Sequence, residues 1–351
     1  MPTKTTAIVQ RNEPQPTLVQ ETIDLPDLTP TQVLVKVENS SLNPTDVQSF
    51  DGDAFGDGAV LGCDFAGTVE EVGSDVSRLK KGDKIAALIW GGEIPGLGAY
   101  SKYCVAEEDV AFKIPAGLDF ASASTVPLAT NTAWLALFSK DCLNIPKETN
   151  KDMSLLVWGG SSTVGSYAIQ LAALHGFNIV TTCSPRNMEM AKKNGATHAF
   201  DYNDPDVVAK IMKAVPDLAY GFDCIGNATS STLCGQAIRE KKGVICTVRP
   251  GKANTENVPS HIDIKDVLVF TAFLKPHVYQ KVYHWDTSYE DHALSKELYE
   301  NIPSLIENGK LVPQRPRSMG TLSVETLTEA MQLIRDKKVS NEKLCFQVAN
   351  M

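Results

Sequence analysis

Two kinds of hydrophobic pattern divide the chain. In its first third, apolar and polar residues alternate, as at 31–38 and 67–73, which is the pattern of half-buried β-strands. Residues 81–83 (Lys-Gly-Asp) are typical of a turn that leads into another strand. We therefore expect a β-rich domain over residues 1–126.

A second pattern begins near residue 127, where helix-like and strand-like segments follow one another. A helix is predicted at 128–138, and short apolar runs predict buried strands at 154–158, 178–182, 198–201, 218–224 and 243–248, with helices between them. One of these helices is expected to open at Asp204 and Pro205, because proline is favoured in the first turn of a helix. The alternation predicts an α/β domain over 127–273, with a parallel, doubly wound sheet and right-handed crossovers.

The last part of the chain, residues 274–351, is mixed. Helices are predicted at 293–309 and 323–337, a short strand at 310–313, and a final strand at 343–348. The final strand lies too far along the chain to extend the parallel sheet simply. We expect it to return to the N-terminal domain.

Composition is that of an ordinary globular protein. The chain has 351 residues and a formal net charge of −9, and it contains no run rich in Lys or Arg of the kind that holds nucleic acid. No apolar run approaches the ~18 residues that a membrane span needs, and residues 1–6 lack the apolar stretch of a signal peptide. We expect a cytoplasmic protein with no nucleic-acid or membrane partner. Its eight cysteines form no Cys-x-x-Cys pair and are expected to be buried free thiols.

A glycine-rich turn after the strand at 154–158 is the strongest chemical signal. Its pattern is Gly160-x-Ser162-x-x-Gly165, at the point where a helix is predicted to begin. Free backbone N–H groups and the helix dipole attract a pyrophosphate there, and glycine lets the backbone approach it. Serine replaces the middle glycine of the dinucleotide fingerprint, yet the surrounding strand–helix units favour a dinucleotide site.

The end of the next strand favours NADPH over NADH. An NAD site usually has an acidic residue there that binds the ribose 2′-hydroxyl, but residues 181–187 contain none. Ser184 and Arg186 instead offer hydrogen bonds and a positive charge to a 2′-phosphate. The alternative for Arg186 is an ordinary solvated side chain at a helix start. Tyr202 also has two interpretations, because it either packs beside the adenosine or is a plain surface residue.

Motifs along nearly the whole chain resemble the medium-chain dehydrogenase/reductase superfamily. The matching segments are residues 41–46 (Ser-Leu-Asn-Pro-Thr-Asp), 61–69 (Leu-Gly-Cys-Asp-Phe-Ala-Gly-Thr-Val), 81–83, 160–165 and 338–344. The resemblance implies a GroES-like catalytic domain, then a Rossmann domain, then a return to the catalytic domain. This order agrees with the division that the hydrophobic pattern predicts.

Within this superfamily the chain is similar to the zinc-independent, quinone oxidoreductase-like branch. Zinc-dependent members carry a cysteine ligand ahead of an aspartate and then a Gly-His-Glu segment, whereas this chain has Asn43 and the segment Gly62-Cys63-Asp64. A zinc site needs three or four ligands in tetrahedral reach, and Cys63 and Asp64 have no obvious partner. We therefore expect no zinc and no other bound metal. The resemblance implies reduction of activated carbon–carbon double bonds.

A narrower resemblance, carried by residues 157–166, 184–187 and 200–208, is to the fungal trans-acting enoyl reductases of polyketide biosynthesis. It implies NADPH contacts from Thr45, Asp46, Val47, Gln48, Gly160, Ser161, Ser162, Thr163, Val164, Gly165, Ser184, Pro185, Arg186, Asn187, Tyr202, Val248, Arg249, Val339 and Ser340. It implies substrate contacts from Ala129, Thr130, Asn131, Thr132, Ala133, Trp134, Val269, Phe270, Thr271, Ala272 and Phe273. Family members often have lysine where this chain has Gln48, which keeps hydrogen-bonding capacity but loses the charge.

The implied reaction transfers a hydride from the nicotinamide to the β-carbon of an α,β-unsaturated carbonyl. Hydrogen-bond donors must then stabilise the enolate oxygen, and the candidates are Thr132, Asn131 and Gln48. Water or a tyrosine such as Tyr283 is the expected source of the proton for the α-carbon. The aromatic segment 277–285 is interpreted either as a wall of the substrate cleft or as an ordinary amphipathic surface segment.

Three functions stay open at this point. The first is a trans-acting enoyl reductase that acts on a carrier- or CoA-linked intermediate of fungal secondary metabolism, with a polyketide synthase as the implied partner. The second is a free-standing quinone or alkenal reductase with a small diffusible substrate. The third is a catalytically silent member that serves as a binding or regulatory protein.

Overall fold

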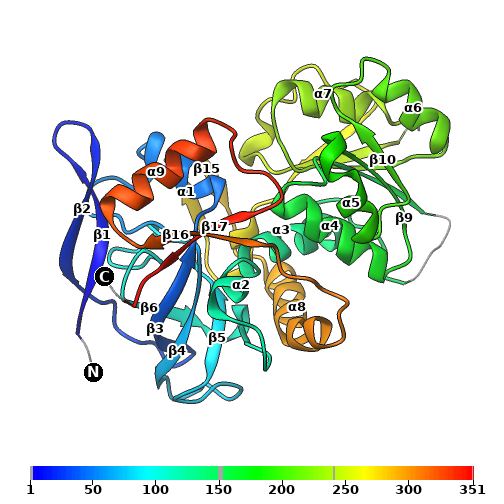
Figure 1. The fold of residues 1–351 in the computed structure, drawn as a ribbon. Coiled ribbons are helices and arrows are strands. Elements are labelled where there is room, and N and C mark those ends of the chain that lie inside the picture. The colour runs from blue at the N-terminus through cyan, green and yellow to red at the C-terminus, as the bar shows by residue number, and fades with distance from the viewer. Residues whose placement is uncertain (1–2, 149–152, 240–241, 350) are drawn as a thin grey trace. The chain divides into compact units, whose positions relative to one another are not determined.

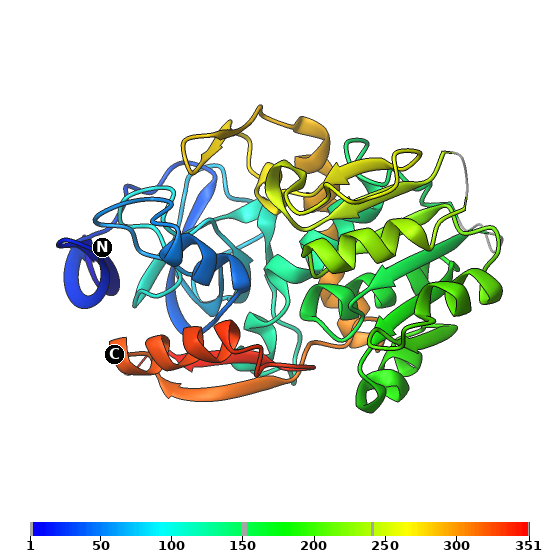
Figure 2. The ribbon, with the colours of Figure 1, turned by 90° about the horizontal axis from the view of Figure 1, so that it is seen from above.

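The computed structural model describes residues 3–148, 153–239, 242–349 and 351. These residues divide into two compact units. The first unit contains the chain up to residue 128 together with 270–288 and 296–351, and the second contains 129–269 and 289–295. Both ends of the chain belong to the first unit, as Figure 2 shows.

A seven-stranded sheet is the framework of the first unit. Its strands are β3 (Gln32–Ser41), β4 (Asp64–Val72), β5 (Lys84–Leu88), β6 (Tyr103–Glu107), β7 (Ala111–Lys113), β16 (Pro316–Thr321) and β17 (Lys343–Gln347). Their order is β16-β17-β3-β4-β5-β7, and β6 pairs with β3 off this path. Two hairpins accompany the sheet, one of β1 (Lys4–Asn12) and β2 (Pro16–Asp24) and one of β14 (His277–Tyr279) and β15 (Tyr283–Trp285). The helices that lie in this unit include α1 (Pro44–Asp51), α2 (Phe120–Ser124) and α9 (Val324–Arg335).

The last strand returns to the N-terminal part of this sheet. β17 pairs antiparallel with β3, where Cys345 lies opposite Ser41, and parallel with β16. In Figure 1 the red β17 accordingly runs beside the blue β3. Phe346 is buried in the same apolar cluster as Val33 and Val35 of the alternating segment in β3. The predicted return of the final strand is confirmed.

A six-stranded parallel sheet is the framework of the second unit. Its strands are β8 (Ser154–Trp158), β9 (Asn178–Cys183), β10 (His198–Asp201), β11 (Tyr220–Asp223), β12 (Val244–Thr247) and β13 (Asp263–Asp266), in the order β10-β9-β8-β11-β12-β13. Successive strands are joined by α4 (Thr163–Leu174), α5 (Met188–Lys193), α6 (Val207–Ala214) and α7 (Ala228–Gln236), and α3 (Pro127–Phe138) leads into the unit. The predicted doubly wound α/β architecture is confirmed.

Two predicted elements are wrong. Residues 310–313 form no strand, because the backbone N–H groups of the first two donate to the Leu305 carbonyl oxygen and close the end of α8 (Tyr289–Glu307). The strand of this region is β16, further along the chain. The helix expected to open at Asp204 and Pro205 begins at Val207, after a turn.

All eight cysteines are buried and have free thiols, as predicted. Burial raises the pKa of the Cys183 thiol to about 11 and that of the Cys345 thiol to about 12. At neutral pH these thiols are therefore protonated, and a protonated thiol is a poor nucleophile.

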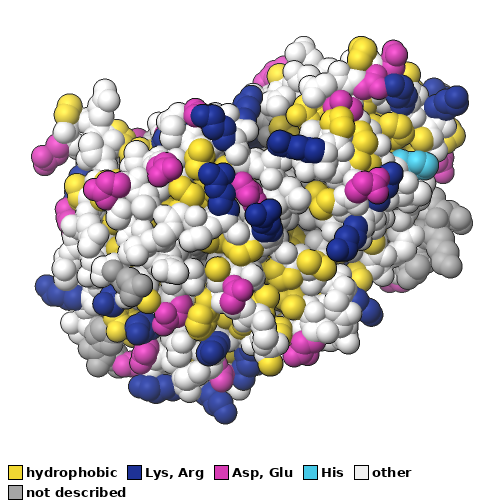
Figure 3. Space-filling model, in the orientation of Figure 1, with side chains coloured by type: hydrophobic (Ala, Val, Ile, Leu, Met, Phe, Trp, Pro, Cys, Tyr) yellow, Lys and Arg dark blue, Asp and Glu magenta, His cyan; other side chains and the backbone are white. Residues whose placement is uncertain are grey.

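The surface carries mixed charge. On the face drawn in Figure 3, acidic and basic side chains are interspersed with apolar ones. Within the part of the chain that the structure describes, no helix is long and apolar enough to cross a membrane.

Candidate functional site

The carboxyl edge of the parallel sheet gathers most of the residues predicted to bind the cofactor. In the strand register Trp158 lies opposite Thr182 and Asp223, and Asp201 lies opposite Cys183. The segments that follow these strand ends therefore lie along one edge, where ligands of open α/β sheets bind. They contain the predicted residues Gly160, Ser161, Ser162, Thr163, Val164, Gly165, Ser184, Pro185, Arg186, Asn187, Tyr202, Val248 and Arg249.

The turn between β8 and α4 depends on its glycines. Gly159 has a φ of +90°, which other residues rarely adopt. A Cβ atom on Gly160 would lie 2.1 Å from the Thr181 hydroxyl oxygen, and one on Gly165 would lie 2.3 Å from the Gly159 carbonyl oxygen. Ser162, which replaces the middle glycine of the fingerprint, caps α4 because its hydroxyl oxygen accepts from the Gly165 N–H at 3.0 Å.

Three backbone N–H groups of this turn are available to a ligand. Ser161, Thr163 and Val164 donate no backbone hydrogen bond to any residue that the structure describes. For Thr163 and Val164 the reason is that the first N–H groups of a helix have no acceptor within the helix, whereas Ser161 lies in the turn before the N-cap residue. All three residues are only partly buried. Together with the positive end of α4 they provide the donors that a pyrophosphate needs.

The end of β9 carries a free cation and no carboxylate. Arg186 is exposed, and its guanidinium makes no hydrogen bond or ion pair with the described residues. The Ser184 hydroxyl oxygen accepts from the Asn187 side-chain amide at 3.1 Å, which leaves the hydroxyl proton able to donate. A phosphate at this position would meet one positive charge and a hydroxyl donor.

The other predicted residues of this edge differ in how firmly they are held. Tyr202 is exposed after β10. Arg249 is fixed after β12, where its Nε donates to the Gly226 carbonyl oxygen at 3.0 Å. Asp223, at the end of β11, is buried and accepts hydrogen bonds from two backbone N–H groups and two serine hydroxyls. Its carboxylate is thereby occupied within the protein.

In the first unit, the first turns of α1 carry the predicted cofactor residues Thr45, Asp46, Val47 and Gln48. The buried Asp46 carboxylate accepts from the Asn43 backbone N–H at 2.8 Å and from the Tyr100 hydroxyl at 3.0 Å. Burial nevertheless raises the pKa of Asp46 to about 6, because desolvation of the charged form outweighs these two donors and the Cys63 thiol together. Gln48 is half-buried, and its side chain makes no hydrogen bond within the described ranges.

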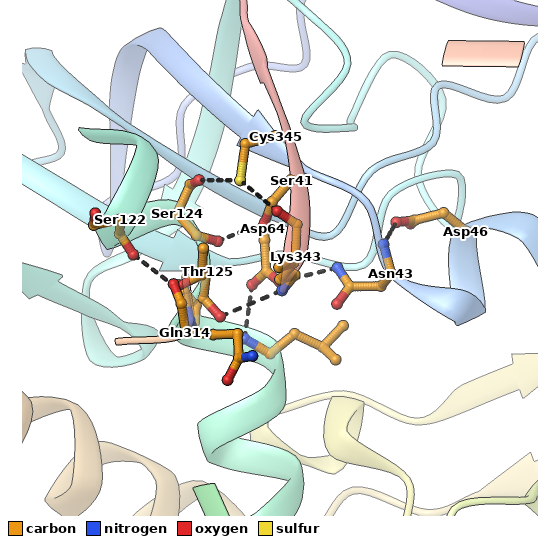
Figure 4. A network of polar contacts seen from close by, with 12 residues as sticks. Ser41, Asn43, Asp46, Asp64, Ser122, Ser124, Thr125, Gln314, Lys343 and Cys345 are labelled. Atoms are coloured by element: carbon orange, nitrogen blue, oxygen red, sulfur yellow. Dashed lines mark hydrogen bonds and ion pairs between the residues drawn. The ribbon is translucent and has the colours of Figure 1, made fainter. Parts of the chain in front are cut away.

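A buried ion pair lies next to the start of α1 (Figure 4). Asp64, the first residue of β4, forms it with Lys343, the first residue of β17. Their side chains are 0% and 3% exposed. Asp64 also accepts from the Asn43 side-chain amide at 2.9 Å and from the Leu128 backbone N–H at 2.7 Å. Lys343 makes a longer contact of 3.4 Å to the Thr125 carbonyl oxygen.

This network includes or adjoins the positions at which zinc-dependent members of the superfamily have zinc ligands, here Asn43 and the segment Cys63–Asp64. The Asn43 amide donates to Asp64, which is itself paired with an ammonium group. Burial raises the pKa of the Cys63 thiol well above its usual range, and the neighbouring Asp46 raises it further. Among residues 3–148, 153–239 and 242–349, no group of three or more His, Cys, Asp and Glu side chains is arranged to hold a metal.

The residues predicted to bind the substrate lie mainly on two helical segments. Ala129, Thr130, Asn131, Thr132, Ala133 and Trp134 follow one another in α3, whereas Val269, Phe270, Thr271 and Ala272 form a 3₁₀ turn that Phe273 follows. The Thr130 hydroxyl and both polar atoms of the Asn131 amide are buried without a hydrogen-bond partner in the described structure. Phe270 stacks on Trp90 with ring centroids 4.1 Å apart.

The remaining candidates lie near the C-terminus. Tyr283 is half-buried in β15, next to Trp285. In the same hairpin His277 is buried and Val278 is exposed. The His277 Nδ1 atom lies 2.8 Å from a Glu93 carboxylate oxygen. Val339 and Ser340 lie in the irregular segment that leads into β17.

Sequence reasoning missed the pairing of Asp64 with Lys343. A signal for it exists at Asp64, which is flanked by the apolar residues Cys63 and Phe65, and a weaker one at Lys343, which is followed by Leu344. A charge within an apolar strand is almost never fully buried unless it is paired. The pattern predicts that a partner exists, but it does not identify it.

Comparison with known proteins assigns the family. Residues 29–116 match the family model of the alcohol dehydrogenase GroES-like domain, and residues 163–285 match that of the zinc-binding dehydrogenase. The trans-enoyl reductase caaB of Aspergillus niger is 32% identical, with 99% of this chain and 98% of that protein covered. The enoyl reductase component lovC of the lovastatin nonaketide synthase of Aspergillus terreus is 31% identical, with 89% of this chain and 88% of that protein covered.

A solved structure supports the fold. The quinone oxidoreductase from Coxiella burnetii matches with a TM-score of 0.72 at 24% identity, over 98% of this chain and 99% of that one. The sequence matches establish the family as well as the fold, because they combine more than 30% identity with nearly full coverage. The chain therefore belongs to the medium-chain dehydrogenase/reductase superfamily and, within it, to the family of trans-enoyl reductases.

Proposed function

We propose that this protein is an NADPH-dependent enoyl reductase that transfers a hydride to the β-carbon of an α,β-unsaturated acyl group. The observation that carries the proposal is the sheet edge where three free backbone N–H groups and the free Arg186 guanidinium lie together. The relatives that match over nearly the whole chain are named enoyl reductases. Both observations support a reductase that uses a phosphorylated dinucleotide.

The residues of this edge fit NADPH. The N–H groups of Ser161, Thr163 and Val164 would bind the pyrophosphate, and Arg186 with Ser184 would bind the 2′-phosphate. The sequence between β9 and Glu189 contains no carboxylate that would repel that phosphate. When bound, NADPH supplies the hydride, which no side chain of the protein supplies.

The chain itself must orient the acyl group and stabilise the negative charge that develops on its carbonyl oxygen. We propose Asn131 and Thr132 of α3 as the donors, because both are buried and the Asn131 amide has no partner in the described structure. Water or Tyr283 supplies the proton that the α-carbon then takes up. No metal is required for these steps.

We propose that the enzyme works without zinc. Asn43 stands where zinc-dependent relatives have a cysteine, and the adjacent carboxylate of Asp64 is neutralised by Lys343. An amide paired with a carboxylate and a neutral, buried Cys63 thiol supports this interpretation.

The substrate is proposed to be an unsaturated thioester carried by a polyketide synthase in the cytoplasm. The names of the relatives support this, since several are trans-enoyl reductases and one is the enoyl reductase component of the lovastatin nonaketide synthase. On this proposal the protein acts as a separate partner that reduces a growing chain.

An activity assay tests the proposal. It contains the purified protein, NADPH and the N-acetylcysteamine thioester of but-2-enoic acid. We expect NADPH to be oxidised and the saturated thioester to form, with the same rate in the presence of EDTA. If the transferred hydrogen of NADPH is replaced by deuterium, the label should appear at the β-carbon. Oxidation of NADPH by quinones alone would indicate a quinone reductase instead, and failure to bind NADPH at micromolar concentration would overturn both enzymatic functions.

A further inference from the structure

The Asp64–Lys343 pair joins parts of the first unit that are far apart in sequence. The two residues are 279 positions apart, and both are almost completely buried. Ordering and desolvating two charges is costly, and a buried pair of this kind is often no more stabilising than apolar residues of the same size. Its presence therefore calls for an explanation other than stability.

The pair controls the start of α3. This helix begins at Pro127, which has no N–H, and the preceding residue, Val126, has no side-chain acceptor with which to cap it. Asp64 supplies the missing acceptor from another strand, since its Oδ1 accepts from the Leu128 N–H at 2.7 Å. Its negative charge also lies at the positive end of the helix. Lys343 contacts the Thr125 carbonyl oxygen just before the same helix.

The pair also controls the start of α1. Asn43 is the residue before this helix, and its side-chain amide donates to Asp64 Oδ2 at 2.9 Å. The same oxygen accepts from Lys343 Nζ. Figure 4 shows the three side chains converging from β4, β17 and the segment before α1. One carboxylate thus holds the first turns of two helices.

Both helices carry residues of the proposed reaction immediately after the point that is held. Residues 45–48, predicted to contact the cofactor, follow Asn43 in α1, and residues 129–134, predicted to contact the substrate, follow Leu128 in α3. The third partner, Lys343, directly follows the segment that contains Val339 and Ser340. The residues next to these three segments, Asn43, Leu128 and Lys343, all contact the Asp64 carboxylate.

We propose that Asp64 and Lys343 are positioning residues of the reductase, which set the first turns of α1 and α3 and thereby the orientation of the groups that bind cofactor and substrate. This inference rests on the proposed function. It assigns the pair no contact with the reacting atoms. It explains why a buried ion pair, rather than an apolar contact, is present: an ammonium and two N–H donors from three directions need one acceptor with two oxygens.

A set of variants separates positioning from stability. Lys343→Met leaves the Asp64 carboxylate buried and unpaired, so it should lose both stability and activity. The double variant Asp64→Leu with Lys343→Met removes both charges and should regain much of the stability. Lys343→Arg keeps the charge and should retain activity. Arg317→Met is the matched control, because it breaks the more exposed pair with Glu342 on the neighbouring β16 and β17 segments.

The deciding measurement is kcat and KM for NADPH and for the but-2-enoyl thioester, each taken well below the unfolding midpoint of that variant. If the pair positions the helices, the folded double variant stays impaired by about 10- to 100-fold in kcat/KM, the scale of an ångström-sized misplacement. The Arg317→Met control keeps the wild-type values. A folded double variant with wild-type kinetic constants would overturn the inference while leaving the proposed function intact.

Asn43→Ala provides a second, milder test if the charge variants do not fold. It keeps the ion pair and removes the Asn43 side chain, which links Asp64 to α1 and stands at the N-cap of that helix. We expect KM for NADPH to rise about tenfold while kcat changes less, since only the helix assigned to the cofactor is released. An unchanged KM would contradict the positioning role. A wild-type protein that neither binds nor oxidises NADPH would instead overturn the proposed function, and the inference with it.

Discussion

The carboxyl edge of the second unit and the polar network of the first unit treat hydrogen-bonding groups in opposite ways. At the edge, the N–H groups of Ser161, Thr163 and Val164 and the Arg186 guanidinium have no partner among the described residues, and all are at least partly accessible. In the network, the Asp64 carboxylate is inaccessible and both of its oxygens accept hydrogen bonds.

The difference indicates what each region is for. Donors that are left unpaired but accessible cost little in water and are ready to bind an anion. A buried charge with all its partners present cannot bind anything more, and its removal would disturb every element that it connects. We therefore interpret the edge, called the open edge below, as a binding surface. The Asp64 network, called the closed network below, is interpreted as a support for the first turns of α1 and α3.

The largest effect is expected from closing the open edge at Gly160. A Cβ atom there would lie 2.1 Å from the Thr181 hydroxyl oxygen, so Gly160→Val must displace the turn. Overpacking of this kind costs about 1 to 3 kcal/mol of stability. Because the displaced turn carries the N–H donors for the pyrophosphate, we expect NADPH affinity to fall about 100-fold, equivalent to about 2.7 kcal/mol of binding free energy. Titration of NADPH fluorescence measures the affinity.

Gly309→Asn is the control for this experiment. Its position has a φ of +65° and no neighbouring atom within 4 Å, and asparagine tolerates that conformation. NADPH affinity should stay at the wild-type value in this variant. Equal affinities for Gly160→Val and the wild type would show that the turn does not hold the cofactor.

The next effect concerns Asp46, which adjoins the closed network through Asn43, and its response to pH. Burial raises the pKa of Asp46 from its ordinary value of 3.8 to about 6, so the folded protein binds a proton more readily than the unfolded chain between these values. The stability that this group contributes is therefore present below about pH 4 and is lost as the pH rises through 6. The shift corresponds to about 3 kcal/mol.

Asp46→Asn removes this titration and keeps an oxygen that can accept from Asn43 and Tyr100. Urea unfolding of both proteins from pH 4 to pH 8 tests the prediction. Relative to the variant, the wild type should lose free energy of unfolding between pH 4 and 6 and then run parallel to it. Parallel curves over the whole range would mean that Asp46 does not titrate in this interval.

The two regions also differ in how much of them could be predicted from the sequence. The strands β8 and β10 have the predicted bounds, 154–158 and 198–201. For β8 the reason is that a short apolar run is enough to define a buried parallel strand. The pattern Gly160-x-Ser162-x-x-Gly165 located the turn, since its steric demands are local. The part of the open edge formed by the glycine-rich turn and the end of the next strand therefore lies within about thirty consecutive residues, so local sequence patterns could predict it.

The closed network joins residues that are far apart in the sequence, and most of its contacts could not be predicted. The partner of Asp64 lies 279 positions away, and no local pattern links the two. Two edge strands were missed for a related reason, because β13 (Asp-Ile-Lys-Asp) and β16 are polar and partly exposed and lack an apolar face. The apolar run at 310–313 was mistaken for a strand, although its backbone closes a helix end.

A smaller effect is expected when the cation of the edge is removed. Arg186→Leu should lower kcat/KM for NADPH about tenfold, because one exposed charge-assisted hydrogen bond to the 2′-phosphate contributes about 1.5 kcal/mol. The value for NADH should stay the same, since NADH has no phosphate at that position. Lys193→Leu, on the exposed end of the following helix, is the control and should change neither value. Equal losses with both cofactors would argue against a role in cofactor choice.

The smallest effect tests whether α3 belongs with the open edge or with the closed network. The Asn131 amide is buried like Asp64, yet both of its polar atoms lack a partner in the described structure, like the donors of the edge. A buried unsatisfied amide destabilises a protein, so Asn131→Leu, which is similar in size, should raise the free energy of unfolding by about 1 kcal/mol. If the amide serves the substrate, kcat for the but-2-enoyl thioester should fall in the same variant, because the enolate oxygen loses a donor. Urea unfolding and steady-state kinetics on one preparation measure both quantities.

A more stable protein with reduced kcat identifies Asn131 as a group whose unpaired state is kept for catalysis. A loss of stability would instead indicate that the amide is a structural group, and Thr132 would then be the donor to test.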